Sequence, residues 1–312
     1  MIYRQLGSSD LNISVVGTGT WGLGNDYSVE TDEKTAIEAI HAGLDSGINF
    51  VDTAPNYGLD RHSEIIVGKA LKGRRDKVFL ATKCGYVRYL GEQVRTLDPL
   101  VLRHEIELSL KALQTDYLDL YQLHWPDYSF GNEAALDFIA DLKKQGKIRY
   151  TGVSNFDPGQ IQVAIDRADI VSNQPPLSMI RRDALKEIVP FCIKNNVGTL
   201  SYGPLDGGVL TGRVDFDNVD QFDVRRWFYG YTPERLEQVK KLVVVLKEIA
   251  DERGISVAQV SIAWNFAQPG VTSALVGASK ASQAVANAAA GDIELTDEEL
   301  KKIDDAYNVH FE

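Results

Sequence analysis

Short apolar segments rich in Val, Ile and Leu alternate along this chain with longer segments whose apolar residues recur at helical spacing. A buried parallel sheet covered by helices produces this alternation, because its strands are apolar on both faces and its helices on one. The pattern predicts eight strands, at residues 15–17, 50–52, 78–82, 118–123, 150–153, 170–173, 198–202 and 274–276. In a chain of 312 residues, eight such units predict one α/β domain over residues 1–312, a (β/α)8 or TIM barrel.

Capping residues indicate where several helices begin. Asp98 and Asp157 each precede a proline, so the acid can cap the helix while the proline occupies its first position. Two further helices, from about residue 234 to 252 and from about 257 to 266, precede the eighth strand and predict an extra helical layer there.

Two segments outside the alternating pattern have their own predicted structures. Residues 3–6 and 11–14 flank the turn residues 7–10, which predicts a β-hairpin that plugs one end of the barrel. Residues 205–233 are too long for an ordinary connection and are glycine-rich at their start. Long segments of this kind often form lids, so we expect one over the site.

Composition points to small-molecule chemistry. The chain has 33 basic and 44 acidic residues and a net charge of -11, which would repel nucleic acid and anionic membranes. The longest aliphatic stretch, residues 242–246, cannot span a bilayer, and the first residues do not have the pattern of a secretory signal. Cys84 and Cys192 are too few for a disulfide framework, so we expect a cytoplasmic protein.

Four polar residues follow predicted strands two, three and four. Asp52, Lys83 and His124 lie at the carboxyl ends of these neighbouring strands, and Tyr57 follows Asp52 by one short loop. Barrel active sites form at this end, so the four side chains should converge. A phenol titrates near pH ~10 and is a weak acid at neutrality unless a neighbouring ammonium lowers its pKa. Lys83 can take that role, His124 can align the proton, and Asp52 can hold Lys83.

Each of these residues also has a purely structural interpretation. Asp52 could cap a turn, Tyr57 could be a surface aromatic, Lys83 could be solvated, and His124 could be a hydrogen-bonded core residue. Taken together at one barrel mouth, the four favour a site that protonates a carbonyl oxygen.

Several separated motifs give the chain a family resemblance over nearly its whole length. It resembles the aldo-keto reductase family, in particular a bacterial branch that includes sugar and general aldehyde reductases and, more distantly, the β subunits of potassium channels. The motifs occur in the family's order: Gly17-Thr-Gly-Thr-Trp-Gly22, Asp52-Thr-Ala-Pro-Asn-Tyr57-Gly58, Thr82-Lys83, Asp116-Tyr-Leu-Asp-Leu-Tyr-Gln-Leu-His124-Trp, Gly146-Lys-Ile-Arg-Tyr-Thr-Gly-Val-Ser-Asn-Phe156 and Val276-Gly-Ala-Ser-Lys280.

The resemblance implies an oxidoreductase that transfers hydride between NADPH and the carbonyl of an aldehyde, ketone or sugar, without a metal. It makes Tyr57 the general acid in reduction and the general base in oxidation, with Asp52, Lys83 and His124 as the other catalytic residues. The resemblance also implies a larger set of cofactor-binding residues: Gly19, Thr20, Trp21, Asp52, Ser154, Asn155, Gln174, Tyr202, Gly203, Pro204, Leu205, Gly207, Gly277, Ser279, Lys280, Gln283 and Asn287.

Within that cofactor set, the resemblance matches Ser154, Asn155 and Gln174 to the nicotinamide carboxamide and Tyr202 to the face of the nicotinamide ring. The alternatives for Ser154-Asn155 and Tyr202 are helix capping and barrel packing. Lys280 is matched to the 2′-phosphate, which favours NADP(H). Residues 281–286 depart from common family patterns and contain no arginine, so NAD(H) remains possible.

Aromatic residues near the strand ends are candidates for the substrate pocket. We expect substrate contacts from Trp21, Tyr57, Tyr86, His124 and Trp125. Further candidate walls are Tyr89, Tyr128 and Trp227, with Arg88 and Arg225 nearby. Such walls suit sugars and aromatic aldehydes equally, and each ring could instead be ordinary packing.

Two other functions fit parts of the sequence. The chain could bind NADP(H) as a redox-sensing or regulatory subunit with little turnover, although the complete set of four catalytic residues argues against this. It could also be a barrel enzyme acting on phosphosugars without hydride transfer, which Asn155, Gln174 and Tyr202 together disfavour.

Overall fold

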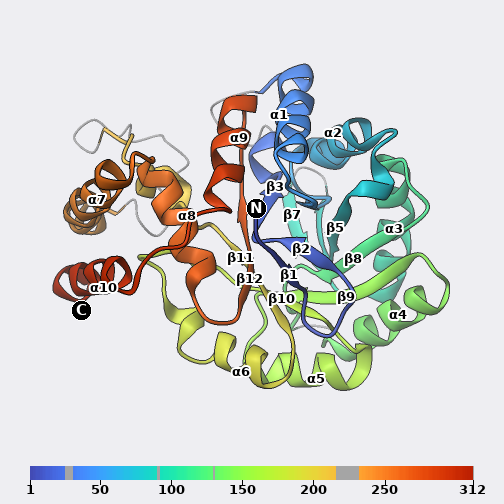
Figure 1. Cartoon of the computed structure of the whole chain (residues 1–312). Helices are drawn as coiled ribbons and strands as arrows, with labels where there is room; N and C mark the ends of the chain where they lie inside the picture. The colour runs from blue at the N-terminus through green and yellow to red at the C-terminus, as the bar shows by residue number, and fades with distance from the viewer. Residues whose placement is uncertain (25–30, 90–91, 129–130, 216–231, 312) are drawn as a thin grey trace.

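The computed structural model describes residues 1–24, 31–89, 92–128, 131–215 and 232–311. Within this part of the chain, eight parallel strands close into a barrel surrounded by helices, as predicted (Figure 1). In barrel order the strands are β3 (Val16–Gly19), β4 (Phe50–Asp52), β5 (Phe79–Cys84), β8 (Leu118–Leu123), β9 (Ile148–Ser154), β10 (Ser172–Gln174), β11 (Gly198–Tyr202) and β12 (Val271–Val276).

Helices follow the strands and form the outer layer. They are α1 (Glu33–Asp45), α2 (His62–Leu71), α3 (Pro99–Leu113), α4 (Glu133–Lys144), α5 (Pro158–Ala168), α6 (Ile188–Lys194), α8 (Val257–Ala267) and α9 (Ala281–Ala290). The predicted caps are present: the Asp98 carboxylate accepts from the backbone N–H of Leu100, and Asp157 forms a capping box with Gln160.

The extra helical layer before the eighth strand is also present. It consists of α7 (Pro233–Arg253) with α8, and α7 packs beside the C-terminal helix α10 (Asp297–Phe311) on one side of the barrel (Figure 1). Within the described residues, no helix is long and apolar enough to cross a membrane.

The predicted hairpin consists of β1 (Tyr3–Gln5) and β2 (Asn12–Ser14), and it crosses the amino end of the barrel (Figure 1). Leu6, Leu11 and Ile13 are fully buried and pack with residues of the barrel interior such as Phe50. Gly7 has a φ of 53°, and a Cβ there would lie 2.2 Å from the Val171 carbonyl oxygen, so only glycine fits this approach. The hairpin therefore leaves the carboxyl end as the open end of the barrel.

Strand boundaries differ from the prediction at both ends of several strands. β5 continues through Lys83 and Cys84, because Lys83 pairs with Gln122 and Cys84 with Leu123 on β8. β9 begins at Ile148 and β12 at Val271, earlier than predicted, and β10 begins at Ser172, later than predicted. A second hairpin, β6 (Tyr86–Tyr89) and β7 (Glu92–Arg95), was not predicted, and every residue of β7 is exposed.

The segment predicted to be a lid begins with a short 3-10 helix, η5 (Asp206–Thr211). Residues 216–231, including Arg225, Arg226 and Trp227, lie outside the described residues. The lid therefore stays a prediction.

Candidate active site

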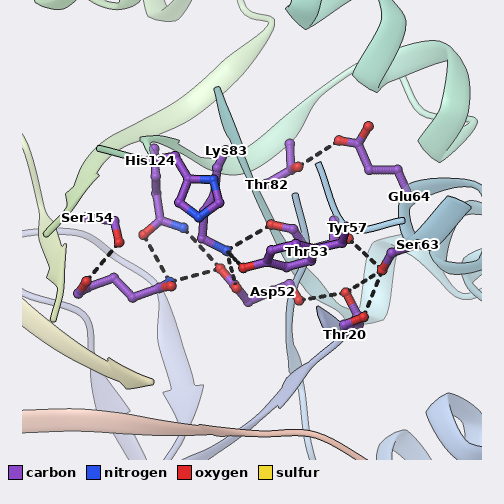
Figure 2. Close-up of polar contacts among 12 residues, drawn as sticks. Thr20, Asp52, Thr53, Tyr57, Ser63, Glu64, Thr82, Lys83, His124 and Ser154 are labelled. Atoms are coloured by element: carbon purple, nitrogen blue, oxygen red, sulfur yellow. Dashed lines mark hydrogen bonds and ion pairs between the residues drawn. The ribbon is translucent and has the colours of Figure 1, made fainter. Parts of the chain in front are cut away.

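Strand ends bring the four predicted catalytic residues together at the open end of the barrel. Asp52 ends β4, Lys83 lies on β5, His124 follows β8, and Tyr57 comes from the loop between β4 and α2. Figure 2 shows the Lys83 ammonium between the Asp52 carboxylate and the Tyr57 hydroxyl. Convergence on one mouth follows from the parallel barrel, because the carboxyl ends of neighbouring strands meet there.

Lys83 uses its three N–H groups within this cluster. Its Nζ lies 2.5 Å from Asp52 Oδ1, 3.0 Å from the Thr53 carbonyl oxygen and 3.0 Å from the Tyr57 hydroxyl oxygen. Its side chain is 0% exposed. A buried ammonium requires this number of acceptors, since it has lost its water.

The second carboxylate oxygen of Asp52 accepts two further hydrogen bonds. The side-chain amides of Gln122 and Gln174 each donate to Asp52 Oδ2 at 3.0 Å. Gln122 was not predicted as a site residue. Strand alternation could have identified it, because Gln122 lies two residues before His124 and therefore faces the same side of β8.

The pKa of Tyr57 is raised by burial, which outweighs the opposing effect of the Lys83 charge. This differs from the expectation that the ammonium leaves the phenol more acidic than usual, because Lys83 offsets part of the burial effect without reversing it. Burial lowers the pKa of Lys83, but the charges of Asp52 and Tyr57 and the hydrogen bonds to both together outweigh it, so the pKa of Lys83 is raised. Lys83 is therefore an ammonium and Tyr57 a neutral phenol at neutral pH.

His124 lies with its ring edge-on to two tyrosines. The ring centroids of His124 and Tyr57 are 5.9 Å apart, and those of His124 and Tyr86 are 5.5 Å apart. Burial lowers the pKa of His124 well below its usual value, and the charges of Lys83 and Arg95 lower it further. The imidazole is therefore neutral. In the described part of the chain, no hydrogen-bond partner reaches its buried Nδ1.

A cluster of hydroxyl groups contacts the backbone at Asp52. Thr20 Oγ1 donates to the Asp52 carbonyl oxygen at 3.0 Å, and Ser63 Oγ donates to Thr20 Oγ1 at 2.8 Å. Thr53 Oγ1 lies 3.1 Å from Ser63 Oγ. These contacts join the ends of β3 and β4 to the first turn of α2 (Figure 2). Thr20, predicted to bind cofactor, is fully buried in this cluster.

The residues matched to the nicotinamide carboxamide form one connected group. Ser154 Oγ donates to the Gln174 carbonyl oxygen at 2.8 Å, and Asn155 Nδ2 donates to the His124 carbonyl oxygen at 3.0 Å. The Tyr202 hydroxyl donates to Asn155 Oδ1 at 2.9 Å, and burial raises the pKa of Tyr202 to about 12. The structure thus brings Ser154, Asn155, Gln174 and Tyr202 beside His124.

The loop after β12 is ordered by two side chains of α9. Gln283 Oε1 accepts from the backbone N–H of Ser279 at 2.9 Å, and Asn287 Nδ2 donates to the Gly277 carbonyl oxygen at 3.1 Å. Lys280 is exposed at the N-terminus of α9. Gly277 also lies near Gly19, since a Cβ at Gly277 would be 3.6 Å from the Gly19 carbonyl oxygen.

The remaining predicted cofactor residues, Gly203, Pro204, Leu205 and Gly207, lead from β11 into η5. A Cβ at Gly203 or Gly208 would meet no atom within 4 Å in the described part of the chain. An open glycine-rich edge allows a ligand to approach the backbone closely. Together with the amide and hydroxyl groups near His124, this edge fits a nicotinamide dinucleotide.

Predicted substrate contacts surround the same mouth. Trp21 is 41% exposed on the 3-10 helix η1 (Trp21–Gly24), while Tyr86 and Trp125 are half-buried. Tyr128, by contrast, is 86% exposed, and its role as a pocket wall stays a prediction. The side chains of Arg88 and Tyr89 lie outside the described residues, as do Arg225 and Trp227. Arg95, which was not predicted, lies over Tyr86 and Trp125.

Sequence comparison assigns the chain to a family. The profile of the Aldo/keto reductase family matches residues 15–308. The chain belongs to the aldo/keto reductase family. Aldo-keto reductase YhdN of Bacillus subtilis is 38% identical over 287 residues, which are 91% of this chain and 86% of the relative. An Escherichia coli protein named NADH-specific methylglyoxal reductase is 30% identical over 308 residues, 94% of each chain.

Solved structures of family members share the fold of this aldo/keto reductase. A glycerol dehydrogenase from Gluconobacter oxydans has a TM-score of 0.90 and 34% identity, covering 99% of this chain and 95% of its own. An aldo-keto reductase from Bacillus halodurans has a TM-score of 0.82 and 30% identity over the whole of both chains. The resemblance and the barrel fold are thereby confirmed. The family supports, in general, an oxidoreductase that acts on carbonyl or sugar substrates with a nicotinamide cofactor.

Proposed function

We propose that this aldo/keto reductase reduces the carbonyl of an aldehyde, ketone or sugar with hydride from NADPH, and that Tyr57 supplies the proton. The observation that carries the proposal is the 3.0 Å hydrogen bond from Lys83 Nζ to the Tyr57 hydroxyl, which joins a fully buried ammonium to a half-buried phenol. A phenol that must alternate between neutral and anionic forms needs a fixed positive charge beside it.

The chemistry of each residue follows from the charge that develops on the substrate. As hydride reaches the carbonyl carbon, negative charge grows on the carbonyl oxygen, and a donor positioned there stabilises it. Tyr57 transfers its proton to that oxygen, and the neutral imidazole of His124 donates a second hydrogen bond. Lys83 stabilises the resulting phenolate, while Asp52 keeps Lys83 charged. In the oxidative direction the Tyr57 phenolate accepts the proton from the alcohol.

Cofactor contacts follow the same strand ends. Ser154, Asn155 and Gln174 would hold the carboxamide of the nicotinamide, and Tyr202 would cover its ring. Lys280 would attract the 2′-phosphate of NADPH. The name of the E. coli relative includes NADH, so this chain could also use NADH, and the choice rests on Lys280.

The names of the relatives support a substrate class, and the cysteines support a cellular compartment. The relatives' names include methylglyoxal and glycerol, which supports a small carbonyl compound or polyol as substrate, including those of sugar metabolism. Free, buried Cys84 and Cys192 support a reducing compartment, the cytoplasm. The alternative function, an NADP(H)-binding redox sensor, would use the same cofactor contacts with little turnover.

Fluorescence and absorbance together test the proposal. Intrinsic tryptophan fluorescence would follow titration with NADPH and with NADH, and absorbance of the reduced nicotinamide would then follow addition of aldehydes. We expect cofactor binding and aldehyde-dependent loss of absorbance. Binding without turnover across the panel would favour the sensor, and absence of binding would overturn the whole assignment.

One substitution separates catalysis from cofactor binding. Tyr57→Phe should lower kcat by about 10² to 10⁴, the usual contribution of general acid catalysis, while cofactor still binds. Tyr121→Phe is the matched control, since Tyr121 is a fully buried tyrosine on the outer face of β8. Unchanged turnover in Tyr57→Phe would eliminate Tyr57 as the proton donor.

A further inference from the structure

Arg95 lies over two aromatic rings at the mouth of the site. It is the last residue of β7 and pairs with Tyr86, the first residue of β6. Its guanidinium carbon lies 5.4 Å from the centre of the Tyr86 ring and 4.2 Å from the centre of the Trp125 ring. Contact with two π faces limits the positions that this long side chain can take.

The same rings connect Arg95 to the reacting centre. Tyr86 is edge-on to His124, with 5.5 Å between ring centroids, and Trp125 directly follows His124 in the chain. The Tyr86 ring centre lies 5.5 Å from the His124 ring centre and 5.4 Å from the guanidinium carbon of Arg95. The distance between the guanidinium carbon and the imidazole centre therefore cannot exceed the sum of these two distances. A substrate whose carbonyl lies at Tyr57 and His124 would extend towards Arg95 over a short spacer.

Arg95 keeps its hydrogen-bonding capacity for a ligand. Other arginines of this chain pair with carboxylates, as Arg61 does with Glu64 and Arg253 with Glu299. Across the described residues, Arg95 makes contacts with aromatic rings and no ion pair or hydrogen bond. Its side chain is exposed, so its N–H groups are accessible to a ligand at the mouth.

We propose that Arg95 selects carbonyl substrates that carry a carboxylate, which it binds while the carbonyl lies at Tyr57 and His124. The planar guanidinium matches a carboxylate in shape and charge, and a single positive charge is balanced by a monoanion. In a protein of net charge -11, a fixed cation at the mouth also offsets the repulsion of an approaching anion. This inference rests on the proposed function and narrows its substrate class.

Matched substrates test the inference. The aldehydes 4-oxobutanoate and 5-oxopentanoate would be compared with butanal and pentanal, which have the same chain lengths without the carboxylate. We expect the wild-type protein to have a higher kcat/KM for at least one carboxylate than for its neutral partner, by about fivefold, the upper range for an exposed ion pair. Added salt should reduce this preference, because it screens exposed charges.

Variants separate charge recognition from a structural role of Arg95. In Arg95→Gln the ratio of carboxylate to neutral kcat/KM should fall to about one, and Arg95→Lys should recover part of it because the charge returns. Arg103→Gln is the matched control, because Arg103 is also exposed and lies over a ring, that of Phe138, but on the outer helix α3. A purely structural Arg95 would lower activity on both substrate types and leave the ratio unchanged.

The outcomes distinguish this inference from the proposed function. Reduction of the neutral aldehydes without any preference for the carboxylates would overturn the role of Arg95 and leave the proposed function standing. A preference that survives in Arg95→Gln would also overturn it. Absence of turnover with all four aldehydes would overturn the proposed function, and this inference with it.

Discussion

The Lys83 ammonium lies 3.0 Å from the Tyr57 hydroxyl oxygen at the carboxyl end of the barrel, where Lys83 is fully buried and Tyr57 is half-buried. Burial disfavours the phenolate and raises the pKa of Tyr57, whereas the positive charge of Lys83 lowers it. The proton of Tyr57 is therefore held by two opposing effects, of which burial is the larger. Changing either one should shift the pH at which Tyr57 acts.

The pH dependence of the two reaction directions should reflect this balance. Because the pKa of Tyr57 is raised above its usual 10.0, reduction should be independent of pH around neutrality and oxidation should increase towards alkaline pH. In Lys83→Met, the rise of kcat for oxidation should occur at still higher pH, and kcat should fall by about 100-fold. The measurement is kcat against pH in both directions. Lys72→Met, at an exposed lysine outside the site, is the control, and a rise of kcat for oxidation that does not shift in pH would contradict the role of Lys83.

The buried ion pair should show strong coupling in stability. Asp52→Asn leaves the Lys83 ammonium buried without its counter-charge, which should cost about 3–5 kcal/mol in the free energy of unfolding. In a Lys83→Met background the same change should cost far less, because no charge is left unpaired. Urea unfolding of the two single variants and the double variant measures this coupling.

An exposed pair provides the comparison for this double-mutant cycle. Asp45 pairs with Arg74 at the surface, with side chains 63% and 37% exposed. Asp45→Asn should therefore change the free energy of unfolding by less than about 1 kcal/mol. Equal costs of Asp52→Asn with and without Lys83 would show that the buried pair is not coupled.

Cofactor choice should depend on Lys280. It is exposed beside the loop that Gln283 and Asn287 hold in place. If Lys280 contacts the 2′-phosphate, Lys280→Ala should weaken NADPH binding by about tenfold, the range of a charge-assisted hydrogen bond, with little effect on NADH. Fluorescence titration with both cofactors gives the ratio of Kd values, with Lys72→Ala as the charge-matched control. An unchanged ratio would show that another group selects the cofactor.

A buried carboxyl behind the site should make stability depend on pH. Glu105 Oε2 accepts from the backbone N–H of Gly85 at 2.9 Å, and burial raises the pKa of Glu105 from 4.5 to about 7. Arg61 opposes this shift and Glu64 adds to it. Because the folded-state pKa is the higher one, the stabilisation is present below about 4.5 and is lost as pH rises through about 7.

The sign of that effect leads to a specific test on Glu105. Glu105→Gln removes the titration, so the variant should gain stability relative to wild type between pH 5 and 8, by up to about 3 kcal/mol. Urea unfolding at both pH values measures the change. Glu107→Gln, on the same helix with a side chain 55% exposed, should show no such gain, and an equal gain in both variants would refute the assignment to Glu105.

Local patterns in the sequence identified the repeating units and predicted which side chains meet at the candidate site. The apolar or polar character of each residue indicates which faces of a strand or helix are buried. The alternation of apolar strands and amphipathic helices therefore made the barrel and the extra helices α7 and α8 predictable. The positions of Asp52, Lys83 and His124 at strand ends were enough to predict that they meet, because parallel strands share one carboxyl edge. The cap at Asp157 was predictable for the same local reason.

Only the tertiary structure decided how far burial acts on each group and which residues from distant segments touch. The raised pKa of Tyr57 depends on how completely the fold removes water around the phenol, and short-range sequence patterns do not contain that quantity. Gln122 joined the site through a contact with Asp52, 70 residues away in sequence. Arg95 reached Trp125 because the hairpin of β6 and β7, which was not predicted, pairs Arg95 with Tyr86 beside His124. The sequence by itself therefore determined the barrel and the positions of its candidate catalytic residues, and long-range packing decided the electrostatics and the neighbours of these residues.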